Sequence, residues 1–239
     1  MGRMFEVRKA KMFARWSKNA KAFSKLGKEL AIAVKMGGAD PASNPRLRMA
    51  IQTARSLNMP KDNIQSAINR ASAKDSANLQ EISYEGYGPH GVAIFIEAAT
   101  DNPTRTVANV RSYFSKCNGQ LGTSGSVDFL FTRKGVITIA MPTGDMDEFE
   151  LEMIDHGLED IYQTEEGLVL NCQFSDFGGL QKALEAKNIE VKSAGLQRFP
   201  LTTVEVTAQQ EADIEKLVSM LEEDDDVQHV YHAMKTADS

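Results

Sequence analysis

Apolar positions near the start of the chain recur at helical spacing. Between residues 11 and 35 they follow one another at steps of three and four, the period of one face of an α-helix: Phe13, Trp16, Ala20, Phe23, Gly27, Leu30 and Val34. Basic side chains form a second row about 170° away on the same helical wheel. The segment therefore predicts a helix with an apolar face and an outward cationic face, formed by Lys11, Arg15, Lys18, Lys21, Lys25, Lys28 and Lys35.

Two shorter helices are expected next. Gly37-Gly38 ends the first helix, and Asn44 followed by Pro45 begins the second, because asparagine caps helix N-termini and proline suits the first helical position. Apolar residues on its inner face are Leu47, Ala50, Ala54 and Leu57. After a break at 58–60, a third helix turns inward Ile64, Ala67, Ile68 and Ala71. Residues 1–75 thus predict a small domain of three helices.

From residue 81 the hydrophobic period becomes that of strands. Segments 82–84 and 92–97 flank a glycine-rich loop and predict a hairpin. A helix begins at Asn102-Pro103, and the alternation of Val127, Phe129 and Phe131 predicts a further strand with these three side chains facing inward. This half of the chain is therefore expected to be built on β-sheets.

Residues 136–198 contain the elements of a complete unit. Their order is strand, helix, strand, strand, helix, strand, which is the ferredoxin-like plan. A remaining strand–helix–strand piece, 201–231, is too small to stand alone and is expected to join residues 79–133. The predicted class is α+β: an N-terminal three-helix domain (1–75), a discontinuous α/β sandwich (79–133 plus 200–235), and a second sandwich inserted in it (134–199), both sandwiches ferredoxin-like.

Charge is divided unevenly along the chain. Residues 1–75 contain 16 Lys and Arg against 5 Asp and Glu, whereas residues 76–239 contain 11 against 28, within a total net charge of −6. A basic segment on an acidic body is typical of an anion-binding module. A solvated basic helix surface explains the same asymmetry.

Other classes of protein find little support in the sequence. Cys117 and Cys172 are too few for a disulfide framework, and no Cys/His spacing fits zinc. No apolar run approaches the roughly 18 residues of a membrane span. The four histidines are scattered, and none neighbours a Ser or Cys in a recognisable nucleophile context. We therefore expect a cytoplasmic, non-enzymatic protein with no metal, cofactor or membrane partner.

One glycine-rich loop deserves comparison with phosphate-binding loops. The segment 119–125 runs from helix into strand and lacks the spacing of dinucleotide-binding loops. A tight turn is the more economical interpretation, although its backbone amides can also meet a phosphate of a polymer. Possible secondary contacts with nucleic acid, including base stacking on the two tyrosines, are Tyr84, Tyr87, Arg105, Arg111, Lys116, Thr123 and Ser124.

Five segments of this sequence resemble the YebC/PmpR family. They are Gly37-Gly-Ala-Asp-Pro-Ala-Ser-Asn-Pro-Arg-Leu-Arg48, Asn58-Met-Pro-Lys-Asp-Asn-Ile64, Tyr84-Glu-Gly-Tyr-Gly-Pro89, Thr100-Asp-Asn-Pro-Thr-Arg-Thr106 and Gly122-Thr-Ser-Gly-Ser-Val127. Members are described as probable transcriptional regulators, and eukaryotic relatives act in mitochondrial translation. The resemblance implies a helical head, two α/β domains and a nucleic-acid ligand. The first ten residues differ from the Gly-His-Ser-Lys-Trp-Ala-Asn-Ile-Lys-His opening of many members.

Three hypotheses follow from these observations. The first is a transcriptional regulator that binds DNA through phosphate contacts of the basic head. The second is a translation factor that binds ribosomal RNA or the ribosome, because phosphate contacts serve either polymer equally well. The third, from fold analogy alone, is a small-molecule sensor. The oligomeric state stays open.

The first two hypotheses share one set of expected contacts. They are the basic side chains of the predicted helical domain: Arg8, Lys9, Lys11, Arg15, Lys18, Lys21, Lys25, Lys28, Arg46, Arg48, Arg55 and Lys61.

Overall fold

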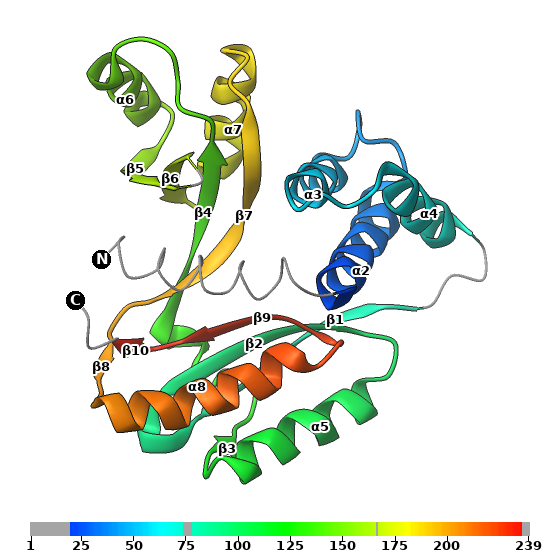
Figure 1. The fold of residues 1–239 in the computed structure, drawn as a ribbon, viewed down its shortest axis with the longest axis vertical. Helices are drawn as coiled ribbons and strands as arrows, with labels where there is room; N and C mark the ends of the chain where they lie inside the picture. Colours follow the sequence, from blue (N-terminus) through cyan, green and yellow to red (C-terminus); the bar gives the residue numbers. More distant parts are fainter. Residues whose placement is uncertain (1–19, 74–77, 166, 236–239) are drawn as a thin grey trace.

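The computed structural model describes residues 20–73, 78–165 and 167–235. Their helices and strands form three groups (Figure 1): a helical head, a sheet covered by two helices, and a second sheet that the chain completes before it returns to the first. We call residues 20–73 the head and the rest the body. The expected α+β class, with an N-terminal helical part followed by two sheet-containing parts, is confirmed.

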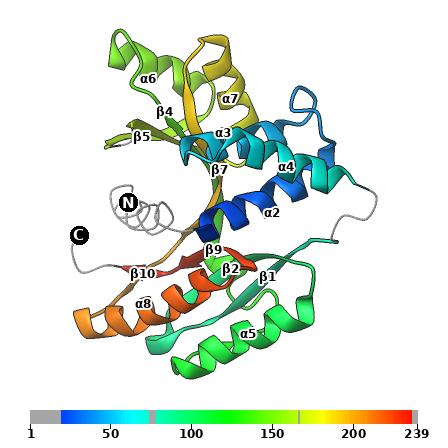
Figure 2. The ribbon, with the colours of Figure 1, turned by 45° about the vertical axis from the view of Figure 1, so that its right-hand side comes forward.

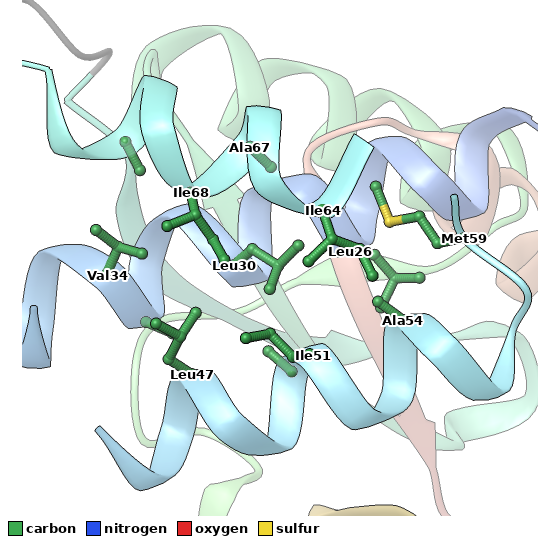
Figure 3. Close-up of a cluster of buried hydrophobic side chains, with 13 residues drawn as sticks. Leu26, Leu30, Val34, Leu47, Ile51, Ala54, Met59, Ile64, Ala67 and Ile68 are labelled. Atoms are coloured by element: carbon green, nitrogen blue, oxygen red, sulfur yellow. The ribbon is translucent and has the colours of Figure 1, made fainter. Parts of the chain in front are cut away.

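The head consists of three helices around one apolar core. Helix α2 (Ala20–Gly37) packs against α3 (Pro45–Ser56) and α4 (Lys61–Ser72). Figure 3 shows that α3 and α4 run in opposite directions, with their apolar side chains facing those of α2. The inward residues expected of the third helix are all buried, and α2 contributes Phe23, Leu26, Leu30, Ala33 and Val34. Part of the expected apolar stripe is thus confirmed, with Leu26 and Ala33 added to it.

The connection between α2 and α3 is held by the side chain of Asn44. Its Nδ2 donates hydrogen bonds to the carbonyls of Ala33 and Gly38, at 2.7 and 2.8 Å, while its Oδ1 accepts from the backbone N–H of Leu47 at 3.0 Å. A Cβ at Gly37 would lie 2.7 Å from this side chain. Only glycine therefore leaves room for the buried cap at this position.

The first sheet, here called the central sheet, has the strand order β3-β1-β2-β9 and is antiparallel throughout. Its strands are β1 (Gln80–Tyr87), β2 (Ala93–Thr100), β3 (Gln120–Leu121) and β9 (Val227–His232), and the 3₁₀ turn η1 (Pro89–Gly91) joins the first two. Helices α5 (Pro103–Lys116) and α8 (Ala208–Glu223) cover one face and share a core with it. Apolar residues of β2 alternate between this core and the opposite face.

The second sheet, here called the inserted sheet, follows the ferredoxin-like plan. Its antiparallel order is β5-β6-β4-β7, built from β4 (Phe131–Ile139), β5 (Leu158–Thr164), β6 (Gly167–Gln173) and β7 (Val191–Pro200). Helices α6 (Met146–Asp155) and α7 (Phe177–Ala186) pack on one face. The expected βαββαβ order is therefore confirmed.

An arginine of β7 joins the two sheets. The Arg198 guanidinium lies 3.8 Å from the centre of the Phe95 ring on the central sheet. It also donates to Glu97 at 3.1 Å and to Asp128 at 2.6 Å. Beyond this junction, β8 (Val204–Glu205) pairs in parallel with β10 (Met234–Lys235). Figure 2 shows the inserted sheet on one side of this junction and the central sheet on the other, with the head beside both.

Two local expectations are wrong. The segment 127–131 is not a strand of the central sheet: Asp128–Leu130 form a 3₁₀ turn, η2, Phe129 is 66% exposed, and Phe131 begins β4. The N–H groups of Val127 and Asp128 donate to the Glu85 carboxylate, so they are not available to a ladder. The lysine row of α2 does not face solvent throughout, because Lys25 is buried against the body.

We predict opposite outcomes for two glycines on the paired strands β4 and β7, Gly135 and Gly195, which lie opposite Leu196 and Val136. A Cβ on Gly135 would overlap the Phe177 ring and lie 2.6 Å from the Cys172 sulfur. Gly135→Ala should therefore lower the free energy of unfolding by about 1–3 kcal/mol. Gly195→Ala meets no atom within 4 Å and should leave stability unchanged or slightly raised. Urea denaturation of both variants checks the pair, and equal losses would contradict the packing described here.

Candidate nucleic-acid interface

The outward face of α4 is exposed and polar. Packing of Ile64, Ala67 and Ile68 against α2 leaves the opposite side of the helix exposed, with the side chains of Lys61, Asp62, Asn63, Gln65, Ser66, Asn69 and Arg70. Gln65 donates to Asn69 at 3.0 Å, and the Arg70 Nε donates to the Ser66 carbonyl at 3.3 Å. Lysine, arginine and amide side chains are the groups that most often contact phosphates and base edges.

Arg55 extends this face across the turn between α3 and α4. The turn is fixed by Asn58, whose φ is +58°, and by Met59, whose side chain enters the core of the head. Arg55 lies before this turn and Lys61 after it, and both side chains are exposed. No ion pair involves either residue within the described part of the chain. We call Arg55 together with the outward residues of α4 the α4 face.

Five polar or basic residues of the α4 face were not among the expected contacts: Asn63, Gln65, Ser66, Asn69 and Arg70. Helix period places Lys61, Gln65 and Asn69 in one row, four residues apart, that flanks the buried isoleucines, and it places Ser66 opposite them. A sequence search restricted to charge overlooks the amides in that row. Counting every side chain able to donate a hydrogen bond would have found them.

Two lysines of α2 point instead into the body. Lys25 is 4% exposed, and its Nζ donates to the carbonyl of Glu222 at 2.7 Å. The Lys28 Nζ lies 2.7 Å from Asp226 Oδ1 and also donates to the carbonyls of Asp225 and Ala99, at 2.8 and 3.1 Å. Both cations thus attach the head to the body, Lys25 to the last turn of α8 and Lys28 to the segment between α8 and β9.

The Asp226 carboxylate is the centre of this attachment. Besides Lys28 it accepts from Arg105 at 2.7 Å, from Thr106 at 2.8 Å and from Thr100 at 3.1 Å. Burial by itself raises the pKa of Asp226, but the hydrogen bonds from Lys28, Arg105 and Thr106 outweigh it and hold the pKa well below its usual range. The carboxylate therefore stays ionised and links α2, β2 and α5.

Two arginines of α3 also pair within the chain. Arg46 contacts Glu29 of α2 at 3.0 Å and Glu81 of β1 at 2.5 Å. These hydrogen bonds, with that of Glu81 the strongest, raise its pKa. Arg48 lies 3.8 Å from Glu185 of α7, where α3 packs along β7. Arg46 and Arg48 thus contribute to the seam between head and body.

The glycine-rich loop already holds an anion of the chain itself. The Glu85 carboxylate is 3% exposed and accepts from the backbone N–H groups of Gly125, Val127 and Asp128, each at 2.8 Å. Burial raises the pKa of Glu85, yet the three amides and Arg198 outweigh it and lower the pKa. A tight turn closed on an internal carboxylate is thus the arrangement present.

The residues expected to make secondary contacts with nucleic acid do not form one surface. Tyr84 packs between the central sheet and its helices, whereas Tyr87 is 40% exposed and its hydroxyl donates to the Ser126 carbonyl at 3.4 Å. Thr123 and Ser124 are exposed in the same loop. The remaining three lie on α5: Arg105 at its start, bound to Asp226, and Arg111 and Lys116 exposed along it.

Part of the expected interface lies outside the residues that the structure describes. These positions are Arg8, Lys9, Lys11, Arg15 and Lys18, together with the side chain of Lys21.

Within the described ranges, no group of three or more His, Cys, Asp or Glu is placed to hold a metal ion. None of the helices in the described part is long and apolar enough to cross a membrane.

Comparison with known proteins gives a consistent family. The family model described as "TACO1/YebC protein N-terminal domain" matches residues 3–74, and "TACO1/YebC second and third domain" matches residues 79–234. The chain belongs to the TACO1/YebC family. A TACO1/YebC relative from Flavobacterium johnsoniae, named "Probable transcriptional regulatory protein", is 52% identical over 235 residues, covering 98% of this chain and 99% of its own.

Two further similarities extend the TACO1/YebC assignment. A protein of the same name from Porphyromonas gingivalis is 52% identical over 236 residues, covering 98% of each chain. The crystal structure of a conserved hypothetical protein from Aquifex aeolicus has a TM-score of 0.79 and 36% identity, covering 90% of this chain and 89% of that one. The relatives from Flavobacterium johnsoniae and Porphyromonas gingivalis are thus both named as probable transcriptional regulatory proteins.

The segments that carry the TACO1/YebC resemblance form the joints of the fold. Segment 37–48 contains the Asn44 cap, 58–64 the turn between α3 and α4, and 100–106 the ligands of Asp226. Segments 84–89 and 122–127 meet at the Glu85 carboxylate. Their residue types are therefore explained by folding, and the α4 face lies mostly outside them.

We predict that Glu85→Gln destabilises the glycine-rich loop. The amide would retain one acceptor but turn an NH₂ group toward backbone donors, so the free energy of unfolding should fall by about 3 kcal/mol. The exposed Glu190→Gln, which removes the same charge, should cost less than about 0.5 kcal/mol. Chemical denaturation compares the two variants. Equal, small losses would show that the loop does not depend on this carboxylate.

A second prediction concerns acid stability. Because the pKa of Asp226 is lower in the folded chain than the usual value of about 3.9, its contribution is complete above that value and is lost as pH falls through the folded pKa. Asp226→Asn should lower the free energy of unfolding by about 3 kcal/mol at pH 7. The gap to wild type should narrow below about pH 4. Denaturation at several pH values measures this gap, and a constant gap would contradict it.

Proposed function

We propose that this protein is a non-enzymatic, cytoplasmic transcription regulator that binds DNA through the α4 face and the basic residues before it. The observation that carries the proposal is the separation of charge. On the exposed side of α4, basic and amide side chains outnumber the one acidic side chain, Asp62, while the residues after position 75 are strongly acidic. Counterion release favours binding of the head to a polyanion, whereas electrostatic repulsion disfavours binding of the acidic body.

The contacts expected from this surface are mainly to phosphates. In helix-turn-helix proteins the two helices cross at about 90–120° and the second enters the major groove. Here α3 and α4 run in opposite directions (Figure 3), and α3 is packed against β7. The α4 face therefore suits backbone contacts more than a full reading of the groove. The names of the bacterial relatives support transcription as the process.

The same geometry gives a reason to keep ribosomal RNA as a second candidate. A surface whose basic side chains contact phosphates and whose amide side chains make single contacts suits structured RNA. Proteins recognise such RNA mostly by its shape and its backbone. Crosslinking in cells, followed by sequencing of the DNA and the RNA recovered, separates the candidates. Enrichment of promoter DNA supports the regulator, and enrichment of ribosomal RNA supports the translation factor.

We predict that the triple variant Arg55→Gln, Lys61→Gln, Arg70→Gln weakens binding to a 20-base-pair DNA duplex. Each lost phosphate contact removes about 0.9 from the slope of log affinity against log salt, so the slope should become shallower by about 2–3. The matched control is Lys182→Gln, Lys187→Gln, Lys216→Gln on the body, with the same change in charge and all three side chains exposed. Fluorescence anisotropy from low to moderate salt measures both. Equal slopes in the two triples would rule out the α4 face.

A further inference from the structure

Two cations of the head are occupied by an acidic segment of the body. Glu222, Glu223, Asp224, Asp225 and Asp226 are consecutive acidic residues, and they begin where α8 ends. The C-terminal carbonyls of a helix carry the negative end of its dipole. Lys25 donates to one of these carbonyls, and Lys28 to an aspartate and a further carbonyl of the same segment.

The surroundings of these ammonium groups match what a nucleic-acid backbone offers. Lys28 is held by one carboxylate oxygen and two carbonyl oxygens, at 2.7–3.1 Å. Lysine binds phosphate as a compact point charge with several donors, without a fixed geometry. The last turn of α8 and the Asp226 carboxylate therefore offer Lys25 and Lys28 negatively polarised or charged oxygen acceptors, as two phosphates would.

We propose that the segment Glu222–Asp226 is an internal competitor that keeps part of the basic surface closed in the free protein. Nucleic acid first meets the α4 face, and separation of α2 from this segment then releases Lys25 and Lys28 for two more phosphates. The inference rests on the proposed function and adds its regulation. Apparent affinity falls with the fraction of molecules in the competent, open state, so loosening the contact should tighten binding.

Asp226→Asn tests the contact directly, and its neighbour supplies the control. Asn retains the shape of the side chain but removes the charge that Lys28 faces. Asp225→Asn removes one exposed charge from the same run, while the Asp225 carbonyl stays available to Lys28. We expect Asp226→Asn to bind a 20-base-pair duplex about tenfold tighter than Asp225→Asn, with a salt slope steeper by about 2, because two lysines are released.

Separation of the head can be measured without nucleic acid. Fluorophores attached at Asn63→Cys on α4 and Ser115→Cys on α5 occupy exposed positions, whereas Cys117 and Cys172 are buried. Energy transfer should decrease in Asp226→Asn and stay at the wild-type value in Asp225→Asn. Lys28→Gln breaks the same contact from the side of the head and should also decrease it. This variant keeps the test decisive if Asp226→Asn does not fold.

The possible results distinguish a failure of the proposed internal competitor from a failure of the proposed nucleic-acid binding. If wild type binds the duplex but Asp226→Asn and Asp225→Asn have equal affinity and equal energy transfer, the competitor is wrong and the nucleic-acid surface stands. If no variant binds duplex DNA or structured RNA, the proposed function fails. Lost energy transfer in Asp226→Asn and Lys28→Gln would then still establish that the acidic segment holds the head closed.

Discussion

A single buried carboxylate determines how the parts of this molecule meet. Asp226 is contacted by a lysine of the head, by a threonine at the end of β2, and by an arginine and a threonine in the first turns of α5. Removing an ion from water is costly, and good geometry with several donors is needed to offset that cost. Because one carboxylate oxygen accepts from the neighbouring segments β2 and α5 and the other from Lys28 of the distant α2, both oxygens are satisfied only when the head lies against the body.

The same principle recurs at the other joints. Glu85 closes the loop before η2, and Arg198 fastens β7 to the central sheet through Glu97 and a Phe95 ring. Buried ionic groups at such places favour one arrangement of packed parts over others that bury similar apolar area. The carboxylates of Asp226 and Glu85 also bind Lys28 and the backbone amides of the glycine-rich loop, groups that the sequence pattern alone suggests as nucleic-acid contacts. An external polyanion is therefore expected to meet first the α4 face, where Arg55 and Lys61 form no ion pair within the described part of the chain.

The sequence predicted the helices and strands well, but it did not predict which distant groups the charged side chains contact. Helix period identified the buried residues of α4, and the order of elements identified the ferredoxin-like unit. The strand expected at 127–131 failed because Glu85, 42 residues before Val127, takes its backbone donors. Lys25 and Lys28 look like any other lysines of an amphipathic helix. Their acceptors lie 197 and 198 residues away, a pairing that only folding reveals.

The central claim is that nucleic acid meets the head on the outward side of α4. Amide hydrogen exchange of the full chain, with and without saturating DNA duplex or structured RNA, locates that contact directly. Added protection is expected in residues 55–72. Faster exchange is expected in residues 222–226 as the acidic segment is released. Protection confined to α6 and α7, with residues 55–72 unchanged, would contradict the claim.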